Sequence, residues 1–236
     1  GIGGMRALEA VGEQFEVYHL NEGHAAFQGV ERLKNLMSRE HLTFEEAKTV
    51  VRSSALFTTH TPVPAGHAYF PEDLLRNYLW EYVHDMGIPW EDFVALGRVR
   101  PNDSNELFSM SYLASRLSQE INGVSELHGT VSQNMFSVLY PGYNWEENHV
   151  GFVTNSVHYP SWIANEWHEV LSKDKNEKFL ENQSNPDVWR VVNKLSDERV
   201  SEIRNQLKVN FLDHVKSVFQ KDMTKRGDRP RHIFEV

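Results

Sequence analysis

Cysteine is absent from this sequence of 236 residues. A disulfide scaffold, a thiol nucleophile and a zinc site with cysteine ligands are therefore all excluded. Disulfides belong to oxidising compartments, so the absence of cysteine is typical of a cytoplasmic protein, and we predict that location.

Long apolar runs are also missing, and no stretch approaches the roughly 20 apolar residues that cross a bilayer. Residues 1–8 have neither the basic start nor the apolar stretch of a signal peptide, and they do not begin with methionine. We expect the sequence to be an internal piece of a longer protein.

Basic residues are in the minority, since 24 lysines and arginines face 33 aspartates and glutamates and leave a net charge of −9. A general nucleic-acid or membrane-surface role needs a basic face and is not expected. The apolar residues, at 40%, suffice for a packed core. The length suits one large domain or two small ones.

Three short apolar runs, at residues 17–20, 55–60 and 150–154, predict buried parallel strands. Asn21 follows the first run as a suitable helix cap, and apolar residues then recur at helical spacing to residue 37. Thr43 and Glu46 form a capping-box pattern that opens the next helix. This alternation favours an α/β, helix-rich fold with a sheet covered by helices.

Further helical patterns occupy residues 71–86, 90–96, 109–119 and 126–139, and residues 62–66 form a loop rich in proline. After residue 160 the sequence predicts long, charged, amphipathic helices that end near Lys225. Residues 226–230 then form a turn, and residues 232–236 begin another strand. The change in composition at residues 155–160 predicts a domain boundary.

Polar clusters follow each of the three predicted strands, at residues 21–24, 60–62 and 155–158. Ligands of open α/β sheets bind beyond the carboxyl ends of the strands. Amides, imidazoles and a carboxylate suit sugar hydroxyls, and helix N-termini favour an anion such as phosphate. In the alternative interpretation Asn21 is only a cap and the histidines are ordinary loop residues, but three clusters together favour a site.

A metal site is a second interpretation of His19, Glu22 and His24. Their spacing differs from the His-Glu-x-x-His pattern, and His19 and His24 do not share a helix face. We therefore predict no metal here, and we expect Tyr18, His19 and Leu20 to lie in the core. The sequence shows no dinucleotide fingerprint and no nucleophile elbow.

Four segments resemble the α-glucan (glycogen, starch and maltodextrin) phosphorylase family, in particular its shorter bacterial branch. They follow the family's order and spacing, and they read VYHLNEGHAAF at residues 17–27, FTTHTPVPAG at 57–66, NGVSELHG at 122–129 and TNSVH at 154–158. The resemblance implies two Rossmann-like domains facing each other across a cleft, the two-lobed glycosyltransferase-B fold. Residues 1–155 are then the latter part of the N-terminal domain, and residues 156–236 are the helical start of the C-terminal domain.

The reaction that the resemblance implies is reversible transfer of glucosyl units between the ends of an α-1,4-glucan and phosphate, giving glucose 1-phosphate. It places Asn21, Glu22 and His24 beside the glucosyl unit as substrate-binding residues. His60 contacts the sugar as the catalytic residue, and Asn155 reaches a sugar hydroxyl. The implied partners are glucan or maltodextrin, phosphate and glucose 1-phosphate. A homo-oligomer is compatible with the sequence, which does not determine the oligomeric state.

Pyridoxal phosphate is the cofactor that the resemblance implies, bound by a lysine that we expect outside this chain. Lys221 and Lys225 belong to an amphipathic helical pattern and are not candidates for that lysine. Ser156 stands where the family usually has glycine. We therefore expect the parent enzyme to be a glycosyltransferase and this chain alone to be inactive.

Two other functional classes stay open at the level of sequence. One is a retaining glycosyltransferase that uses a nucleotide sugar, as glycogen synthase does. The other is a non-catalytic fragment that binds carbohydrate.

Overall fold

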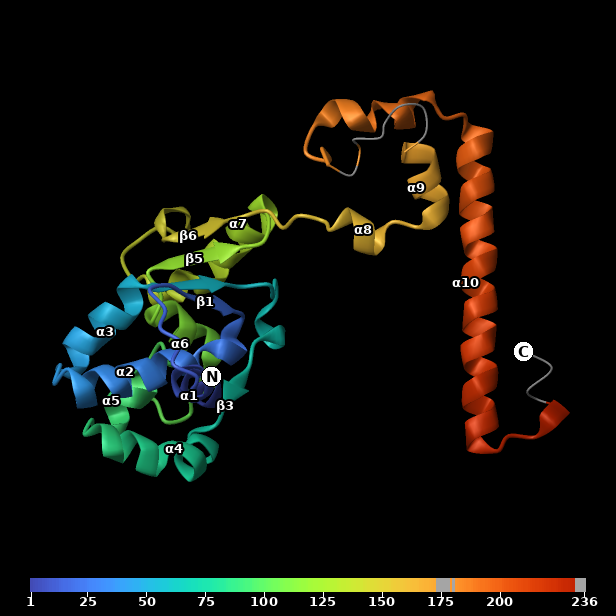
Figure 1. Ribbon diagram of the computed structural model, residues 1–236. Coiled ribbons are helices and arrows are strands. Elements are labelled where there is room, and N and C mark those ends of the chain that lie inside the picture. The colour runs from blue at the N-terminus through green and yellow to red at the C-terminus, as the bar shows by residue number, and fades with distance from the viewer. Residues whose placement is uncertain (173–178, 180, 232–236) are drawn as a thin grey trace. The chain divides into compact units, whose positions relative to one another are not determined.

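A computed structural model describes residues 1–172, 179 and 181–231 of the chain (Figure 1). The chain forms two compact units, Gly1–Asn155 and Ser156–Val236. The division falls where the composition of the sequence changes. Among the described residues, no helix combines the length and the apolar composition that a membrane crossing requires.

A parallel sheet of four strands forms the centre of the first unit, in the order β1-β2-β5-β6. The strands are β1 (Tyr18–Asn21), β2 (Ala55–Thr58), β5 (Glu120–Gly123) and β6 (Val150–Phe152). Leu20 and Phe57 lie opposite each other in the register of β1 and β2, and both are completely buried. The predicted α/β class with a parallel sheet is thus confirmed.

Two details of the predicted strands are wrong. His19 was expected in the core, but its side chain is exposed, because alternate residues of β1 point to opposite faces of the sheet. Phe152 and Val153 are 49% and 67% exposed, since β6 is an edge strand of this unit. Of the three apolar residues that were expected to be buried here, only Val150 is buried.

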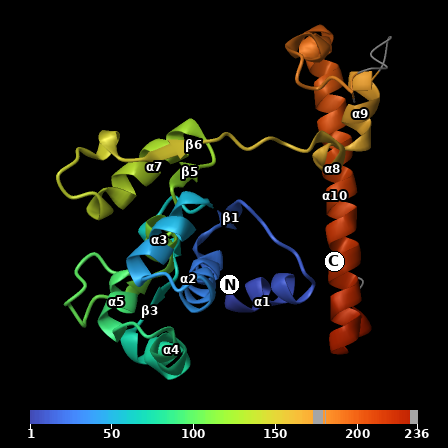
Figure 2. The ribbon, with the colours of Figure 1, turned by 60° about the vertical axis from the view of Figure 1, so that its left-hand side comes forward.

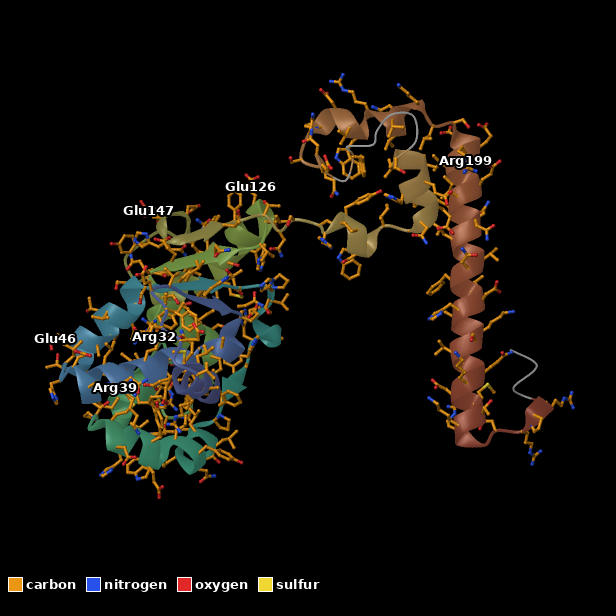
Figure 3. All side chains as sticks on the ribbon, in the orientation of Figure 1. Arg32, Arg39, Glu46, Glu126, Glu147 and Arg199 are labelled. Carbon is orange, nitrogen blue, oxygen red and sulfur yellow. The ribbon has the colours of Figure 1, made fainter. Side chains whose placement is uncertain are left out.

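The first helices follow the predicted pattern closely. They are α1 (Ile2–Ala10), the short 3-10 helix η1 (Gly23–Ala25), α2 (Phe27–Arg39) and α3 (Phe44–Ser53). Thr43 and Glu46 form the predicted capping box, and Figure 3 labels Glu46 at the start of α3. Asn21, however, does not cap a helix. It is the last residue of β1, and Glu22 caps η1 instead.

A second set of elements completes the first unit. These are the 3-10 turn η2 (Pro64–Gly66), β3 (Tyr69–Phe70), α4 (Glu72–Met86), α5 (Trp90–Ala95), β4 (Phe108–Ser109), α6 (Met110–Arg116), α7 (Glu126–Phe136) and the 3-10 turns η3 (Ser137–Leu139) and η4 (Trp145–Glu147). Strands β3 and β4 pair antiparallel. Helix α7 packs against β5 and β6, as Figures 1 and 2 show. Its N-terminus therefore lies next to the carboxyl ends of these strands.

The second unit is helical, as the sequence predicts, but only the last of its described helices is long. It contains α8 (Tyr159–Trp162), α9 (Asn165–Ser172), the 3-10 segment η5 (Pro186–Lys194) and α10 (Asp197–Arg226). Tyr159, Leu171 and Phe179 form its small core. Helix α10 ends at Gly227, which adopts a left-handed φ of 74°. The strand predicted at residues 232–236 lies outside the described residues.

The capping box of α3 gives a test of this fold. Thr43→Ala removes the hydroxyl that accepts from the Glu46 amide and the hydroxyl's own bond to the Glu46 carboxylate. We expect it to lower the free energy of unfolding by about 1 kcal/mol. Thr49→Ala, in the middle of the same helix, is the matched control, because its hydroxyl bonds to the Glu45 carbonyl and to nothing else among the described residues. Urea unfolding of both variants measures the difference, and equal stabilities would show that the box contributes nothing.

Candidate functional site

The carboxyl edge of the parallel sheet brings together polar segments that are far apart in the sequence. The Glu22 amide donates to the Thr58 carbonyl over 2.9 Å, and the Thr59 amide donates to the Asn122 carbonyl over 3.0 Å. The Asn155 amide donates to the Val124 carbonyl over 3.0 Å. The segments that follow all four strands are therefore tied to one another at one edge of the sheet.

His60 and Asn21 contact each other directly at this edge. His60 Nε2 lies 2.7 Å from Asn21 Oδ1. An amide oxygen only accepts hydrogen bonds, so the proton of this contact belongs to Nε2 of His60. When the ring is neutral, its Nδ1 has a free lone pair. The half-buried imidazole is thus held by one nitrogen and keeps the other for a ligand hydroxyl.

Glu22 turns its carboxylate towards the loop that carries His60. The His60 amide donates to Oε1, the Thr61 hydroxyl lies 3.1 Å from the same oxygen, and the Gly23 amide lies 3.2 Å from Oε2. Burial raises the pKa of Glu22, but the hydrogen bonds from His60, Gly23 and Thr61 together outweigh burial and hold it below its usual value. Glu22 is therefore ionised at neutral pH.

A chain of hydrogen bonds runs across three strands beside this group. The Thr58 hydroxyl donates to Asn122 Oδ1 over 2.9 Å, and Asn122 Nδ2 donates to the Gly123 carbonyl over 3.1 Å. His19 Nε2 lies 2.7 Å from the Thr58 oxygen and donates to it, because the Thr58 proton is already used. Thr58 and Asn122 were not predicted as part of this site, although both lie in the segments that carry the family resemblance.

His67 and His128 lie deeper in the same region and were also missed. His67 is 8% exposed, and its Nδ1 lies 2.6 Å from the hydroxyl of Ser111 in α6. His128 Nδ1 accepts from the Val124 amide over 3.1 Å. A Cβ atom on Gly23 would lie 3.0 Å from the Ser111 hydroxyl oxygen, so a residue without a side chain lets η1 approach α6. In the sequence, the glycine directly after Glu22 was the sign of this close approach.

His24 and Asn155 occupy the surface of the first unit. Both side chains are exposed, and neither forms a side-chain hydrogen bond within the part of the chain that the structure describes. Asn155 is tied to the edge of the sheet only by its backbone, and its side chain does not reach His60 through a hydrogen bond. Both side chains therefore stay available to a ligand.

A metal centre finds no support at these residues. Within residues 1–172, 179 and 181–231, no three histidines or carboxylates are arranged to hold a metal ion. His19 bonds to Thr58, while the Glu22 carboxylate faces the His60 loop.

A cavity of about 530 Å³ lies at the opposite edge of the sheet, next to the start of β1. Arg32, labelled in Figure 3, stacks over the Tyr18 ring at 3.6 Å and donates to the Val51 carbonyl. Arg39 pairs with Glu9 across the same cavity. These charged groups bind α1, α2 and α3 to one another, and they are separate from the His60 edge.

We expect His67 to make the free energy of unfolding depend on pH. Burial lowers its pKa, and the nearby Glu22 carboxylate opposes part of that shift. The unfolded chain therefore binds a proton more readily than the folded chain, so the free energy of unfolding should fall as the pH drops below about 6.5. His67→Gln should remove part of that fall in urea unfolding measured between pH 7.5 and pH 5.5. His84→Gln, at an exposed position of α4, is the control, and identical pH slopes for wild type and His67→Gln would rule His67 out.

Comparison with known proteins places these observations in a family. The carbohydrate phosphorylase family model matches residues 5–236. Glycogen phosphorylase of Mycobacterium tuberculosis is 38% identical over 238 residues, which cover 96% of this chain and 27% of that protein. Maltodextrin phosphorylase of Thermococcus litoralis is 37% identical, over 92% of this chain and 25% of the relative. Glycogen phosphorylase of Aquifex aeolicus is 30% identical, over 92% and 30%. The chain spans about a quarter of the length of these relatives, and it belongs to the carbohydrate phosphorylase family.

Proposed function

We propose that this chain is part of a longer α-glucan phosphorylase. That enzyme transfers glucosyl units reversibly between the ends of an α-1,4-glucan and phosphate, giving glucose 1-phosphate. The observation that carries the proposal is the group formed by Asn21, Glu22 and His60 at the carboxyl edge of the parallel sheet, in a chain that matches proteins named as glycogen and maltodextrin phosphorylases.

His60 is the residue to which we assign direct action on the sugar. Asn21 holds Nε2 of the ring in a hydrogen bond, which fixes the orientation of the imidazole. Nδ1 and the backbone carbonyl of His60 can then contact a sugar hydroxyl in a defined geometry. A rigidly held group of this kind orients the substrate and strengthens its hydrogen bond as charge develops at the anomeric carbon. Asn21 and His24 extend the same polar edge and complete the proposed contacts with the glucosyl unit.

Asn155 supplies a second contact with the sugar in this proposal. It is the last residue of the first unit, and its exposed side-chain amide can both donate to and accept from one sugar hydroxyl. Ser156 follows it where the family usually has glycine. We propose that residues 1–155 and 156–236 belong to the two domains of the longer enzyme.

Pyridoxal phosphate, the cofactor that family membership implies, does not fit the described residues at this edge. No lysine occurs in β1, β2, β5 or β6, or in the loops that follow them. Lys221 and Lys225 are exposed on the last turns of α10, in the other unit. We propose that the cofactor and its lysine belong to a part of the longer enzyme outside this chain.

The assay that tests this function follows glucose 1-phosphate formation by the longer protein from glucan and phosphate. We expect the reaction to depend on phosphate and to run in reverse from glucose 1-phosphate. Glucosyl transfer from a nucleotide sugar without phosphate would indicate a nucleotide-sugar glycosyltransferase instead. Glucan binding without turnover would indicate a carbohydrate-binding protein.

Replacing His60 separates catalysis from folding. His60→Ala in the longer enzyme should lower kcat/KM by a factor that corresponds to about 2–4 kcal/mol of transition-state stabilisation, because an oriented hydrogen bond to the sugar is lost. The thermal midpoint should change little, since the side chain is half-exposed. His84→Ala, on the exposed face of α4, is the control. A variant that melts early but turns over normally when folded would make His60 structural.

Replacing Asn155 tests the second contact. Asn155→Ala should weaken use of glucose 1-phosphate by about ten- to a hundredfold, because a desolvated sugar hydroxyl loses a partner worth roughly 1–3 kcal/mol. The family resemblance implies that the partner of Asn155 is the O6 hydroxyl, so a 6-deoxy sugar, which lacks it, should show a much smaller loss. Equal losses on the two sugars would mean that Asn155 only supports the backbone between the units.

A further inference from the structure

Glu22 has a backbone conformation that is normally reserved for glycine. Its φ of 74° and ψ of 164° lie in a region where a Cβ atom is in steric conflict with the backbone. Such a conformation costs free energy, and it persists only where the surrounding contacts determine it. Glycine would adopt it without strain. The presence of glutamate here indicates that its side chain does something that glycine cannot do.

The contacts of the carboxylate show what that is. Oε1 receives the His60 amide, the Thr61 hydroxyl at 3.1 Å and the Thr59 hydroxyl at 3.5 Å. Oε2 receives the Gly23 amide at 3.2 Å. Three of these four donors belong to the loop that follows β2. Each carboxylate oxygen offers two acceptor positions, so Oε1, the oxygen that faces His60, is fully used within the chain, while Oε2 keeps one position.

The charge of Glu22 strengthens this arrangement. The titratable residues that act on it are histidines of the loop after β2, His60 through its backbone amide and His67 through its charge. No lysine or arginine forms an ion pair with Glu22 among the described residues. Hydrogen bonds, and above all the one from the His60 amide, therefore stabilise the negative charge. Bonds to an ionised acceptor are roughly twice as strong as neutral ones.

We propose that Glu22 is a positioning residue that holds the His60 peptide, rather than a direct ligand of the sugar. Glu22 accepts a hydrogen bond from the His60 backbone amide, and Asn21 accepts one from the His60 ring. Two successive residues at the end of β1 therefore position both the peptide and the imidazole of His60, the groups proposed to act on the sugar. This inference rests on the proposed function for its catalytic consequence. The hold on His60 is a property of the chain itself.

The first experiment measures that hold by NMR on the 236-residue chain at pH 7. Glu22→Gln replaces one oxygen with an NH₂ group and removes the charge, while Glu22→Gly removes the strain together with the carboxylate. In both variants we expect the His60 amide signal to move upfield and its hydrogen exchange to accelerate at least tenfold. Glu120→Gln, at the opposite edge of the sheet, is the control and should leave the His60 signal in place.

Glu22→Gly also separates positioning from stability. Because strain is relieved, its thermal midpoint should fall less than that of Glu22→Ala, although both lose the hold on His60. An unchanged His60 amide in Glu22→Gln and Glu22→Gly would overturn the proposal.

The second experiment uses the longer enzyme. If Glu22 positions His60, Glu22→Gln should lower kcat by about ten- to a hundredfold, the scale expected for a misplaced catalytic group, with less than about a twofold change in KM for the glucan. A raised KM with an unmoved His60 amide would make Glu22 a sugar ligand and overturn the proposal. Absence of phosphorolysis in the wild-type longer protein would refute the proposed function, while the NMR result would still decide whether Glu22 holds His60.

Discussion

The parallel pairing of β1 with β2 is the constraint on which the candidate site depends. In this register Asn21 lies opposite Thr58, so the residues that follow the two strands emerge side by side. Glu22 then bonds backbone to backbone with Thr58 and through its carboxylate to His60. A shift of one residue would turn the side chains of β1 to the other face and separate these partners.

The apolar core protects this register. Leu20, Phe57 and Ile121 are buried on three adjacent strands, and the rings of Phe57 and Phe136 meet edge to face with centroids 6.2 Å apart. Phe136 belongs to α7 and also contacts the ring of His67. The helix that covers the sheet therefore reaches the buried histidine behind the site, and core packing and polar contacts support the same loop.

Two kinds of polar group meet at the carboxyl edge of the sheet. His60, Asn21, His24 and Asn155 offer hydrogen-bonding atoms at the surface, whereas Oε1 of the Glu22 carboxylate is occupied by donors of the His60 loop. The two kinds of group suit their two roles. A group that must stay rigid benefits from a charged acceptor, and a group that meets a neutral sugar benefits from atoms that both donate and accept.

The sequence by itself determined the α/β class, the strands β1 and β2, the capping box of α3, the end of α10 and the family. Each of these depends on neighbouring residues or on contiguous motifs, so periodicity and local spacing record them. Tertiary structure decided the rest. Strand β5 has one large apolar residue, Ile121, and is recognised only by its pairing with β2. The bonds of Glu22, Asn21 and His67 join residues 38, 39 and 44 positions apart. Asn21 therefore looks like a helix cap and Glu22 like a free ligand until the folded chain brings the His60 loop against both.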